Sequence, residues 1–136
     1  MVATPQRHVP GNPVKIGLSI LVVDDEFDVA ELLAELLTAR GHRVATAING
    51  MLARTLLDGH DYDLVITDFM MPMIDGMALA QGMRADHRLA GVPVIMISAQ
   101  QDLPPACAEG LVQATLQKPF SPKTLYATID RVMFDR

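Results

Sequence analysis

The sequence predicts an α/β fold: a doubly wound, parallel sheet of five strands, each strand leading into a helix. Short apolar runs rich in β-branched residues alternate with segments of helical periodicity along most of the chain. Strands that alternate with helices form βαβ units, whose right-handed crossovers make the sheet parallel. The chain has 136 residues, which is the size of one domain and enough to bury a core without disulfides or structural metals.

Composition excludes several classes of protein. The formal net charge of −5 argues against a protein that coats nucleic acid, so no direct nucleic-acid partner is expected. No apolar run reaches the roughly 18 residues that cross a bilayer, so no membrane insertion is expected. The single cysteine, Cys107, cannot form an internal disulfide, and no secretory signal opens the chain, so a cytoplasmic location is expected.

Residues 1–17 differ from the rest of the chain. Pro5, Pro10 and Pro13 interrupt any periodicity there, which predicts a flexible N-terminal tail or linker. The folded domain is therefore predicted to span residues 18–134.

Three strands and two helices are predicted in the first half of this domain. The strands lie at 18–23, 43–48 and 63–67, and the helices at 26–40 and 50–59. The strand segments are short and apolar, which is typical of buried strands. In the first helix, polar side chains recur on one face, at Asp28, Glu31, Glu35 and Thr38. Gly41 ends this helix, and Asn49 caps the next one.

The second half continues the alternation. Strands are predicted at 93–97 and 114–117, and helices at 76–88 and from 122 onward. Ser121 followed by Pro122 supplies an N-cap and a favourable first helical residue. The last helix presents one apolar face, formed by Leu125, Ile129, Val132 and Met133.

Polar side chains follow four of the predicted strands, where each strand ends. They are Asp24 and Asp25 after the first strand, Asp68 after the third, Ser98 after the fourth and Lys118 after the fifth. Parallel strands bring their carboxyl ends to one edge of the sheet, where ligands bind in this class of fold. We therefore expect all five side chains to lie together.

The residue types at this edge indicate a chemistry. Carboxylates that lie close together repel each other unless they are protonated or hold a cation, and oxygen ligands without Cys or His favour Mg²⁺. Lys118 and Ser98 suit a phosphate group, as a point charge and a hydrogen-bond donor. An aspartate beside Mg²⁺ can itself accept a phosphoryl group. Taken singly, Asp24 and Asp25 could instead cap a helix, and Asp68 could be a turn residue.

With this set of residues, the sequence closely resembles the receiver domain of response regulators in two-component and phosphorelay signalling. The matching segments are Val22–Glu26, Asp68–Gly76, Ser98–Ala99 and Lys118–Phe120, within a match over about residues 18–134. The resemblance implies a CheY-like sheet with strand order 2-1-3-4-5 and a cis bond between Lys118 and Pro119.

The resemblance also implies a role for each matching residue. Asp68 would be the phosphoacceptor, and Ser98 and Lys118 would contact the phosphoryl oxygens. The implied Mg²⁺ ligands are Asp25, Asp68 and the backbone carbonyl of Met70, with Asp24 acting largely through water.

Two segments depart from the family pattern. The switch position three residues before the lysine, usually aromatic, is Thr115, which has no ring to move between two pockets. Residues 99–112 contain Pro104 and Pro105, which only the first turn of a helix tolerates, so a short, reshaped or mobile fourth helix capped by Asp102 is expected there.

Five methionines crowd the segment after the third predicted strand: Met70, Met71, Met73, Met77 and Met83. Core packing is favoured over an adaptable binding surface as their main role.

The predicted function is a phosphoacceptor switch rather than an enzyme that turns over a substrate. The expected partners are a histidine kinase or histidine phosphotransfer protein and a downstream protein target. A stand-alone regulator and a receiver domain of a larger or hybrid kinase protein remain open, as does a homodimer. The alternatives are a receiver-like binding module that works without phosphorylation, and an aspartyl-phosphate phosphatase, whose Asp-x-Asp motif is not matched by Asp24-Asp25.

Overall fold

The computed structural model describes residues 17–99 and 110–134, and the predicted sheet is present in them. The elements are β1 (Ser19–Val23), α1 (Phe27–Ala39), β2 (Arg43–Ala47), α2 (Gly50–Gly59), β3 (Leu64–Asp68), α3 (Gly76–Ala85), β4 (Val94–Ser98), β5 (Ala114–Gln117) and α4 (Pro122–Phe134). The five strands are parallel and follow the order β2-β1-β3-β4-β5, which confirms the predicted doubly wound topology.

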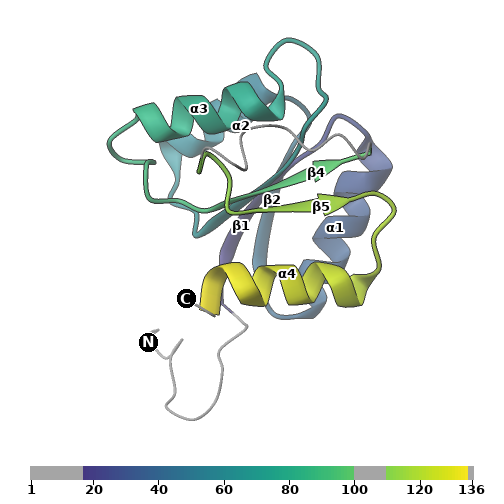
Figure 1. Ribbon diagram of the computed structural model, residues 1–136. Helices are drawn as coiled ribbons and strands as arrows, with labels where there is room; N and C mark the ends of the chain where they lie inside the picture. Colours follow the sequence, from purple (N-terminus) through teal and green to yellow (C-terminus); the bar gives the residue numbers. More distant parts are fainter. Residues whose placement is uncertain (1–16, 100–109, 135–136) are drawn as a thin grey trace.

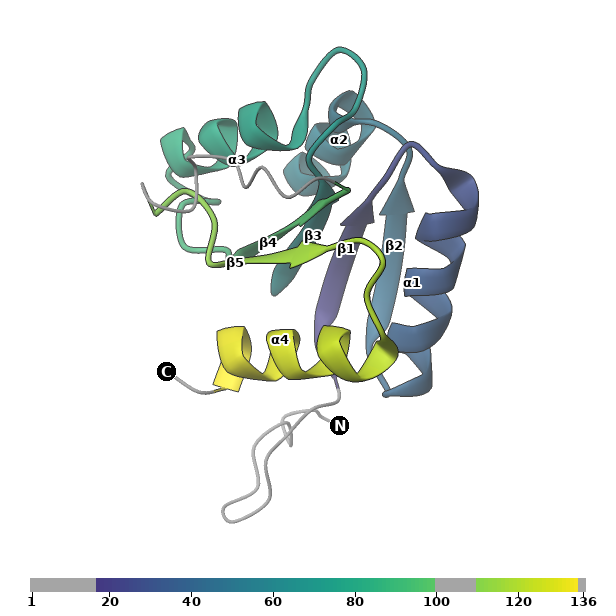
Figure 2. The ribbon, with the colours of Figure 1, turned by 45° about the vertical axis from the view of Figure 1, so that its right-hand side comes forward.

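The helices cover both faces of the sheet. In Figures 1 and 2, α2 and α3 lie over one face, and α1 and α4 lie over the other. β1 has no polar alternation because it is buried on both sides. Ile20 and Val22 pack with the α1 and α4 side chains, whereas Leu21 and Val23 pack with those of α2 and α3. The result is two hydrophobic cores separated by one sheet.

Side chains cap the helices at the positions that the sequence predicts. Asn49 accepts a hydrogen bond from the backbone N–H of Leu52 at 2.7 Å, and Ser121 accepts one from Thr124 at 3.0 Å. Gly41 follows α1 with a φ of +90°, a conformation that glycine adopts without a steric penalty. These local signals define the ends of α1 and the starts of α2 and α4.

Several predicted boundaries were wrong by one residue. The strand predicted at 18–23 begins at 19, and those predicted at 43–48, 63–67 and 93–97 lie at 43–47, 64–68 and 94–98. The helix predicted at 26–40 is shorter at both ends, because Glu26 and Arg40 are its caps. Asp63 lies just before β3, where its carboxylate accepts a hydrogen bond from the backbone N–H of Ser19 at 2.8 Å.

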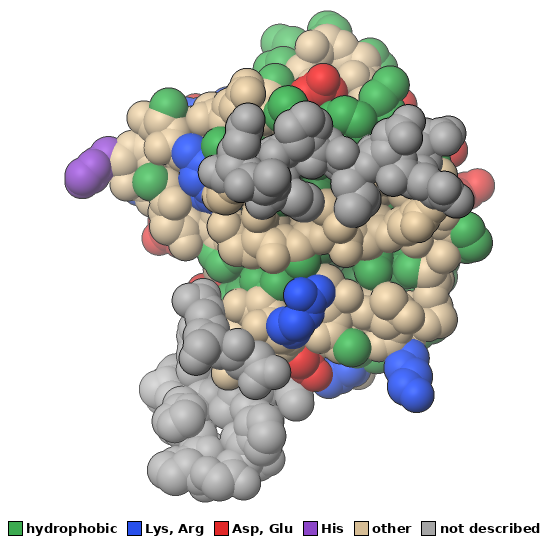
Figure 3. Space-filling model, viewed as in Figure 1, with side chains coloured by type: hydrophobic (Ala, Val, Ile, Leu, Met, Phe, Trp, Pro, Cys, Tyr) green, Lys and Arg blue, Asp and Glu red, His purple; other side chains and the backbone are tan. Residues whose placement is uncertain are grey.

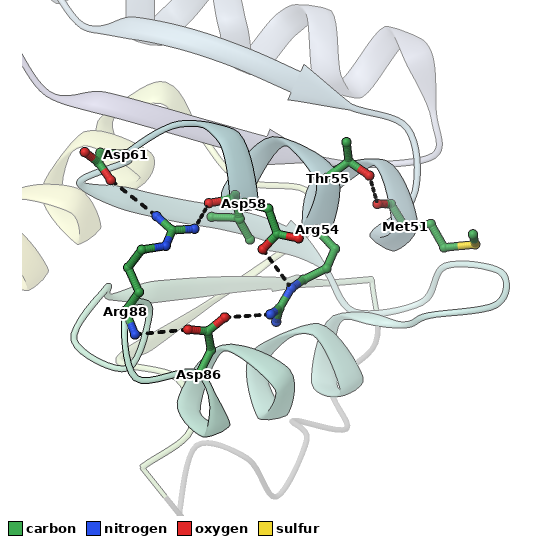
Figure 4. A network of polar contacts seen from close by, with 8 residues as sticks. Met51, Arg54, Thr55, Asp58, Asp61, Asp86 and Arg88 are labelled. Atoms are coloured by element: carbon green, nitrogen blue, oxygen red, sulfur yellow. Dashed lines mark hydrogen bonds and ion pairs between the residues drawn. The ribbon is translucent and has the colours of Figure 1, made fainter.

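The third helix ends three residues earlier than predicted, at Ala85 instead of Arg88. The Asp86 carboxylate accepts a hydrogen bond from the Arg54 guanidinium of α2 at 2.7 Å and another from the backbone N–H of Arg88 at 3.0 Å. Arg88 then reaches back to Asp61, 3.3 Å away (Figure 4). Because Asp86 caps the turn that follows and pairs with α2, the helix stops before it.

Three predictions lie outside the described residues. They are the tail over residues 1–16, residues 100–109 of the fourth-helix region predicted within 99–112, and the environment of Cys107. Over the ranges that are described, no helix is both long and apolar enough to cross a membrane.

Two close approaches of glycine fix how α2 and α3 sit against the loops at the carboxyl edge. A Cβ on Gly50 would lie 2.7 Å from the Cβ of Ile74, and one on Gly76 would overlap the backbone oxygen of Asp68. Gly76 also donates its N–H to the carbonyl of Phe69 at 2.9 Å. The start of α3 therefore rests directly on the backbone that carries Asp68.

We predict that Gly76→Ala lowers the free energy of unfolding by roughly 2–4 kcal/mol, because backbone rather than a flexible side chain must move. Gly59→Ala is the matched control at the end of α2, since a Cβ added there would meet nothing within 4 Å. Urea unfolding followed by circular dichroism measures both. Equal stability of the two variants would contradict the close approach.

Candidate functional site

The carboxyl ends of the strands meet at one edge of the sheet, as the arrowheads in Figure 2 show. Asp24 directly follows β1, while Asp68 and Ser98 are the last residues of β3 and β4. Lys118 directly follows β5, and its backbone N–H donates to the carbonyl of Ser98 at 2.8 Å. The parallel topology thus brings these positions together from four strands.

Three aspartates form an acidic cluster at this edge. One carboxylate oxygen from each of Asp24, Asp25 and Asp68 lies within 4.8 Å of the others. Asp24 is fully buried and Asp68 is 6% exposed, whereas Asp25 is open to solvent. A set of carboxylate oxygens that includes a solvent-exposed member fits Mg²⁺, which keeps several of its waters.

The ammonium group of Lys118 lies among these carboxylates. Its Nζ is 3.5 Å from Oδ2 of Asp24 and 3.6 Å from Oδ1 of Asp68. Lys118 offsets the charge of these two buried aspartates. The peptide bond that follows it, between Lys118 and Pro119, is cis, as the family resemblance implied.

Burial and mutual repulsion perturb the acidity of the cluster. Burial, with the added repulsion of Asp24 and Asp25, raises the pKa of Asp68 to about 6, although Lys118 opposes this shift. Burial also raises the pKa of Asp24. Burial alone would lower the pKa of Lys118, but Asp24, Asp68 and Glu26 outweigh it and raise that pKa above its usual value. Keeping Asp24 and Asp68 ionised in the folded chain therefore lowers the free energy of unfolding.

A hollow of about 560 Å³ opens over the cluster. It is lined by Asp25, Glu26, Asp68, Phe69, Met70, Ala99 and Lys118. Asp24 does not line this hollow, in keeping with its complete burial. Of the three aspartates, Asp68 is the one that is both shielded from bulk water and open to the hollow.

The methionines near the site divide into two groups. Met71 and Met83 pack into the core, as predicted. Met70 and Met73 are 67% and 74% exposed, which the core-packing prediction missed. Figure 3 shows hydrophobic side chains on the loop between β3 and α3, at the top of the view. That loop, residues 69–75, presents an apolar rim beside Asp68.

Like Asp24, the predicted site residues Ser98 and Thr115 do not line the hollow. Ser98 is 2% exposed, and its neighbour Ala99 lines the hollow instead. Thr115 lies within β5, half-buried and paired with Met96 of β4. The structure therefore gathers Asp24, Asp25, Asp68 and Lys118, whereas Ser98 lies buried at the end of β4 and Thr115 lies within β5.

Sequence reasoning missed the part played by Glu26. Its carboxylate Oε1 lies 3.2 Å from Nζ of Lys118, closer than either buried aspartate. Glu26 follows Asp24-Asp25 directly, yet an acidic side chain before the first helix is equally typical of one that only favours the helix dipole. No sequence signal links it to a lysine 92 residues away.

The raised pKa of Asp68 predicts how stability depends on pH in the absence of Mg²⁺. From about pH 4 to 6, the folded chain keeps a proton on Asp68 that the unfolded chain has lost, so stability falls as pH rises through this window. Asp68→Asn removes this cost and should raise the free energy of unfolding at pH 7.5 by roughly 1–3 kcal/mol. Urea unfolding at pH 4 and 7.5 tests this.

The gain should vanish near pH 4, where Asp68 is protonated in most folded and many unfolded molecules. Glu35→Gln, a neutralisation on the exposed face of α1, should change stability by less than about 0.5 kcal/mol at both pH values. An Asp68→Asn protein no more stable than the wild type at pH 7.5 would contradict the raised pKa.

Comparison with known proteins identifies the family. The family model named response regulator receiver domain matches residues 20–130 of this chain. The chain is 37% identical over 115 residues to the transcriptional regulatory protein TcrA of Mycobacterium tuberculosis, covering 83% of this chain and 45% of TcrA. It is 33% identical over 123 residues to the chemotaxis protein CheY-3 of Vibrio cholerae, covering 88% and 94% of the two chains. The chain spans less than half the length of the first curated relatives it matches.

Solved structures agree with the sequence relatives. A response regulator from Chloroflexus aurantiacus superposes with a TM-score of 0.81 at 30% identity, covering 86% of this chain and 98% of the other. The Mg²⁺–BeF complex of the response regulator TrrA from Thermotoga maritima gives a TM-score of 0.77 at 30% identity, covering 85% and 98%. This chain therefore belongs to the response regulator receiver domain family.

Proposed function

We propose that this receiver domain is a phosphoacceptor switch, in which Asp68 accepts a phosphoryl group from a histidine kinase or histidine phosphotransfer protein. The observation that carries the proposal is the pairing of Asp68 with Lys118 across 3.6 Å, beside an acidic cluster suited to a divalent cation. Acceptor, cation site and phosphate-binding ammonium are then adjacent. The product modifies the domain itself, so it acts as a signalling module rather than an enzyme with a released product.

Asp68 is the best placed of the three aspartates to be the acceptor. Asp24 is fully buried and does not line the hollow, so an incoming phosphorus atom has no approach to it. Asp25 is exposed, and its carboxylate is not held close to Lys118 by any contact among the described residues. Asp68 lines the hollow and has an ammonium group within reach, which favours in-line attack.

Mg²⁺ would be held by Asp25, Asp68 and the backbone carbonyl of Met70, with Asp24 acting through water. The cluster fits this ion because its carboxylate oxygens lie within 4.8 Å of one another and Asp25 leaves the site open to water. The bound ion would supply positive charge to the phosphoryl oxygens during transfer. Among the structural relatives, the receiver domain of a sensor histidine kinase from Pseudomonas aeruginosa is described with a magnesium ion in its active-site cleft.

The transfer itself needs few groups from this chain. A carboxylate oxygen of Asp68 attacks the phosphorus of the donor phosphohistidine, and an acyl phosphate bond forms as the phosphorus–nitrogen bond breaks. The electron pair returns to the imidazole, which leaves with a proton taken from solvent. Lys118 holds one phosphoryl oxygen by charge, and the Ser98 hydroxyl donates to another.

The consequence of phosphorylation is a change of binding surface. The new dianionic group draws Lys118 and Ser98 toward it, at the edge where β4 and β5 end. Thr115 occupies the position that is usually aromatic, so no aromatic side chain at that position can change its rotamer in response to phosphorylation. The proposal includes a downstream protein target, no direct nucleic-acid contact, a cytoplasmic location, and a receiver domain over residues 18–134 preceded by a tail.

We predict that a small acyl-phosphate donor with Mg²⁺ adds one phosphoryl group to the wild-type protein, measured as about 80 Da by intact mass spectrometry. Asp68→Asn should abolish the label, because the amide is not a nucleophile. Asp58→Asn, at an exposed site on α2, should label like the wild type. Full labelling of Asp68→Asn would assign the acceptor elsewhere, and an unlabelled wild type would favour a module that works without phosphorylation.

We also predict that Asp25→Asn weakens Mg²⁺ binding by about tenfold or more, because an exposed charged ligand is lost from a small acidic cluster. Isothermal titration calorimetry of the unphosphorylated protein measures this without any donor. Asp61→Asn, which removes a distant exposed carboxylate, should leave the affinity within about twofold. Unchanged Mg²⁺ affinity in Asp25→Asn would contradict its assignment as a ligand.

A further inference from the structure

Among the described residues, the nearest carboxylate to Lys118 belongs to neither of the buried aspartates. Nζ of Lys118 lies 3.2 Å from Glu26, 3.5 Å from Asp24 and 3.6 Å from Asp68. Glu26 lines the hollow from the start of α1, and Lys118 lines it from the end of β5. This ion pair therefore lies in the wall of the proposed phosphorylation site.

The backbone of Glu26 is held firmly, but its side chain does not serve the helix that it begins. Its N–H donates to the Asp24 carboxylate at 2.9 Å, and its carbonyl accepts from Val29 and Ala30 at 3.1 Å. Although Glu26 is the N-cap of α1, its side chain makes no capping hydrogen bond. The carboxylate is thus anchored at its base and directed to Lys118.

The three carboxylates paired with Lys118 differ in the free energy needed to separate each of them from the ammonium group. The Asp24 side chain is fully buried and that of Asp68 is 8% exposed, so each would lose a charge partner without regaining water. The Glu26 side chain is 63% exposed and returns to solvent easily when its partner leaves. Glu26 is therefore the partner that Lys118 can give up first.

We propose that Glu26 is a displaceable partner of Lys118: it holds the ammonium group before phosphorylation, and the phosphoryl group on Asp68 then replaces it. The inference rests on the proposed function, and it adds a residue that influences the free energy of the phosphorylated state. Glu26 is a positioning residue, since it acts on the phosphoryl group through Lys118. Its negative charge also repels the incoming dianion, so it disfavours the phosphorylated state.

The test uses the full chain with Mg²⁺ and beryllofluoride. Beryllofluoride is an analogue of the phosphoryl group that is not lost by hydrolysis. Glu26→Gln should bind it roughly two- to tenfold more tightly than the wild type, as measured by ¹⁹F NMR titration. Glu31→Gln makes the same chemical change one turn further along α1, at an exposed residue outside the hollow. It should stay within about twofold of the wild type.

A second readout separates displacement from a general structural effect. In NMR of protein with ¹⁵N-labelled lysine, Glu26→Gln should shift the Lys118 ammonium resonance relative to the wild type. With beryllofluoride bound, the difference between wild type and variant should be smaller, because the Glu26–Lys118 ion pair is then already broken in the wild type. A shift of equal size in the free and bound states would overturn the proposal. So would beryllofluoride affinity in Glu26→Gln equal to that in Glu31→Gln.

The proposed function and the role of Glu26 fail in different ways. A wild-type protein that neither labels at Asp68 nor binds beryllofluoride contradicts the proposed function itself. A wild-type protein that does both, combined with an unaltered Glu26→Gln variant, leaves the proposed function standing and removes only the role of Glu26.

Discussion

The contact between one ammonium group and a set of carboxylates governs this domain. Asp24 and Asp68 are buried at the carboxyl edge of the sheet, where desolvation raises the pKa of both and repulsion by Asp24 and Asp25 adds to the shift of Asp68. Lys118 opposes that cost for each of them. The remaining excess of negative charge makes the site receptive to a cation, and the ammonium makes it receptive to phosphate. The buried carboxylates thus lower the stability of the fold and, by the same charges, provide a site suited to a cation and a phosphate group.

The fold supplies this arrangement through its topology. Parallel strands end at a common edge, so residues from β1, β3, β4 and β5 meet although they are far apart in the chain. Fine placement comes from backbone contacts: Lys118 is tied to the carbonyl of Ser98, and Gly76 lets α3 begin directly against Asp68. The helices on both faces keep the interior dry, and the low dielectric there strengthens each charge interaction.

The surroundings of the site combine apolar and acidic side chains. Met70 beside Asp68 and Met73 further along the loop are exposed thioethers, and Phe69 adds an aromatic wall to the hollow. A rim of this kind is adaptable, because methionine side chains bend to fit different partners. Glu26, which also lines the hollow, is exposed and charged. An incoming donor would therefore meet both an apolar rim and an acidic side chain.

By itself, the sequence determined the fold class, the strand order through its family resemblance, and the gathering of Asp24, Asp25, Asp68 and Lys118. It could do so because apolar periodicity, caps such as Asn49 and strand-end residues are local signals. Tertiary structure alone decided which groups pair across the chain. Asp86 ends α3 early because Arg54 lies against it, and Glu26 meets Lys118 across 92 residues. Burial likewise separated Met71 from its exposed neighbour Met70. Such contacts depend on where folded elements pack, which no local pattern records.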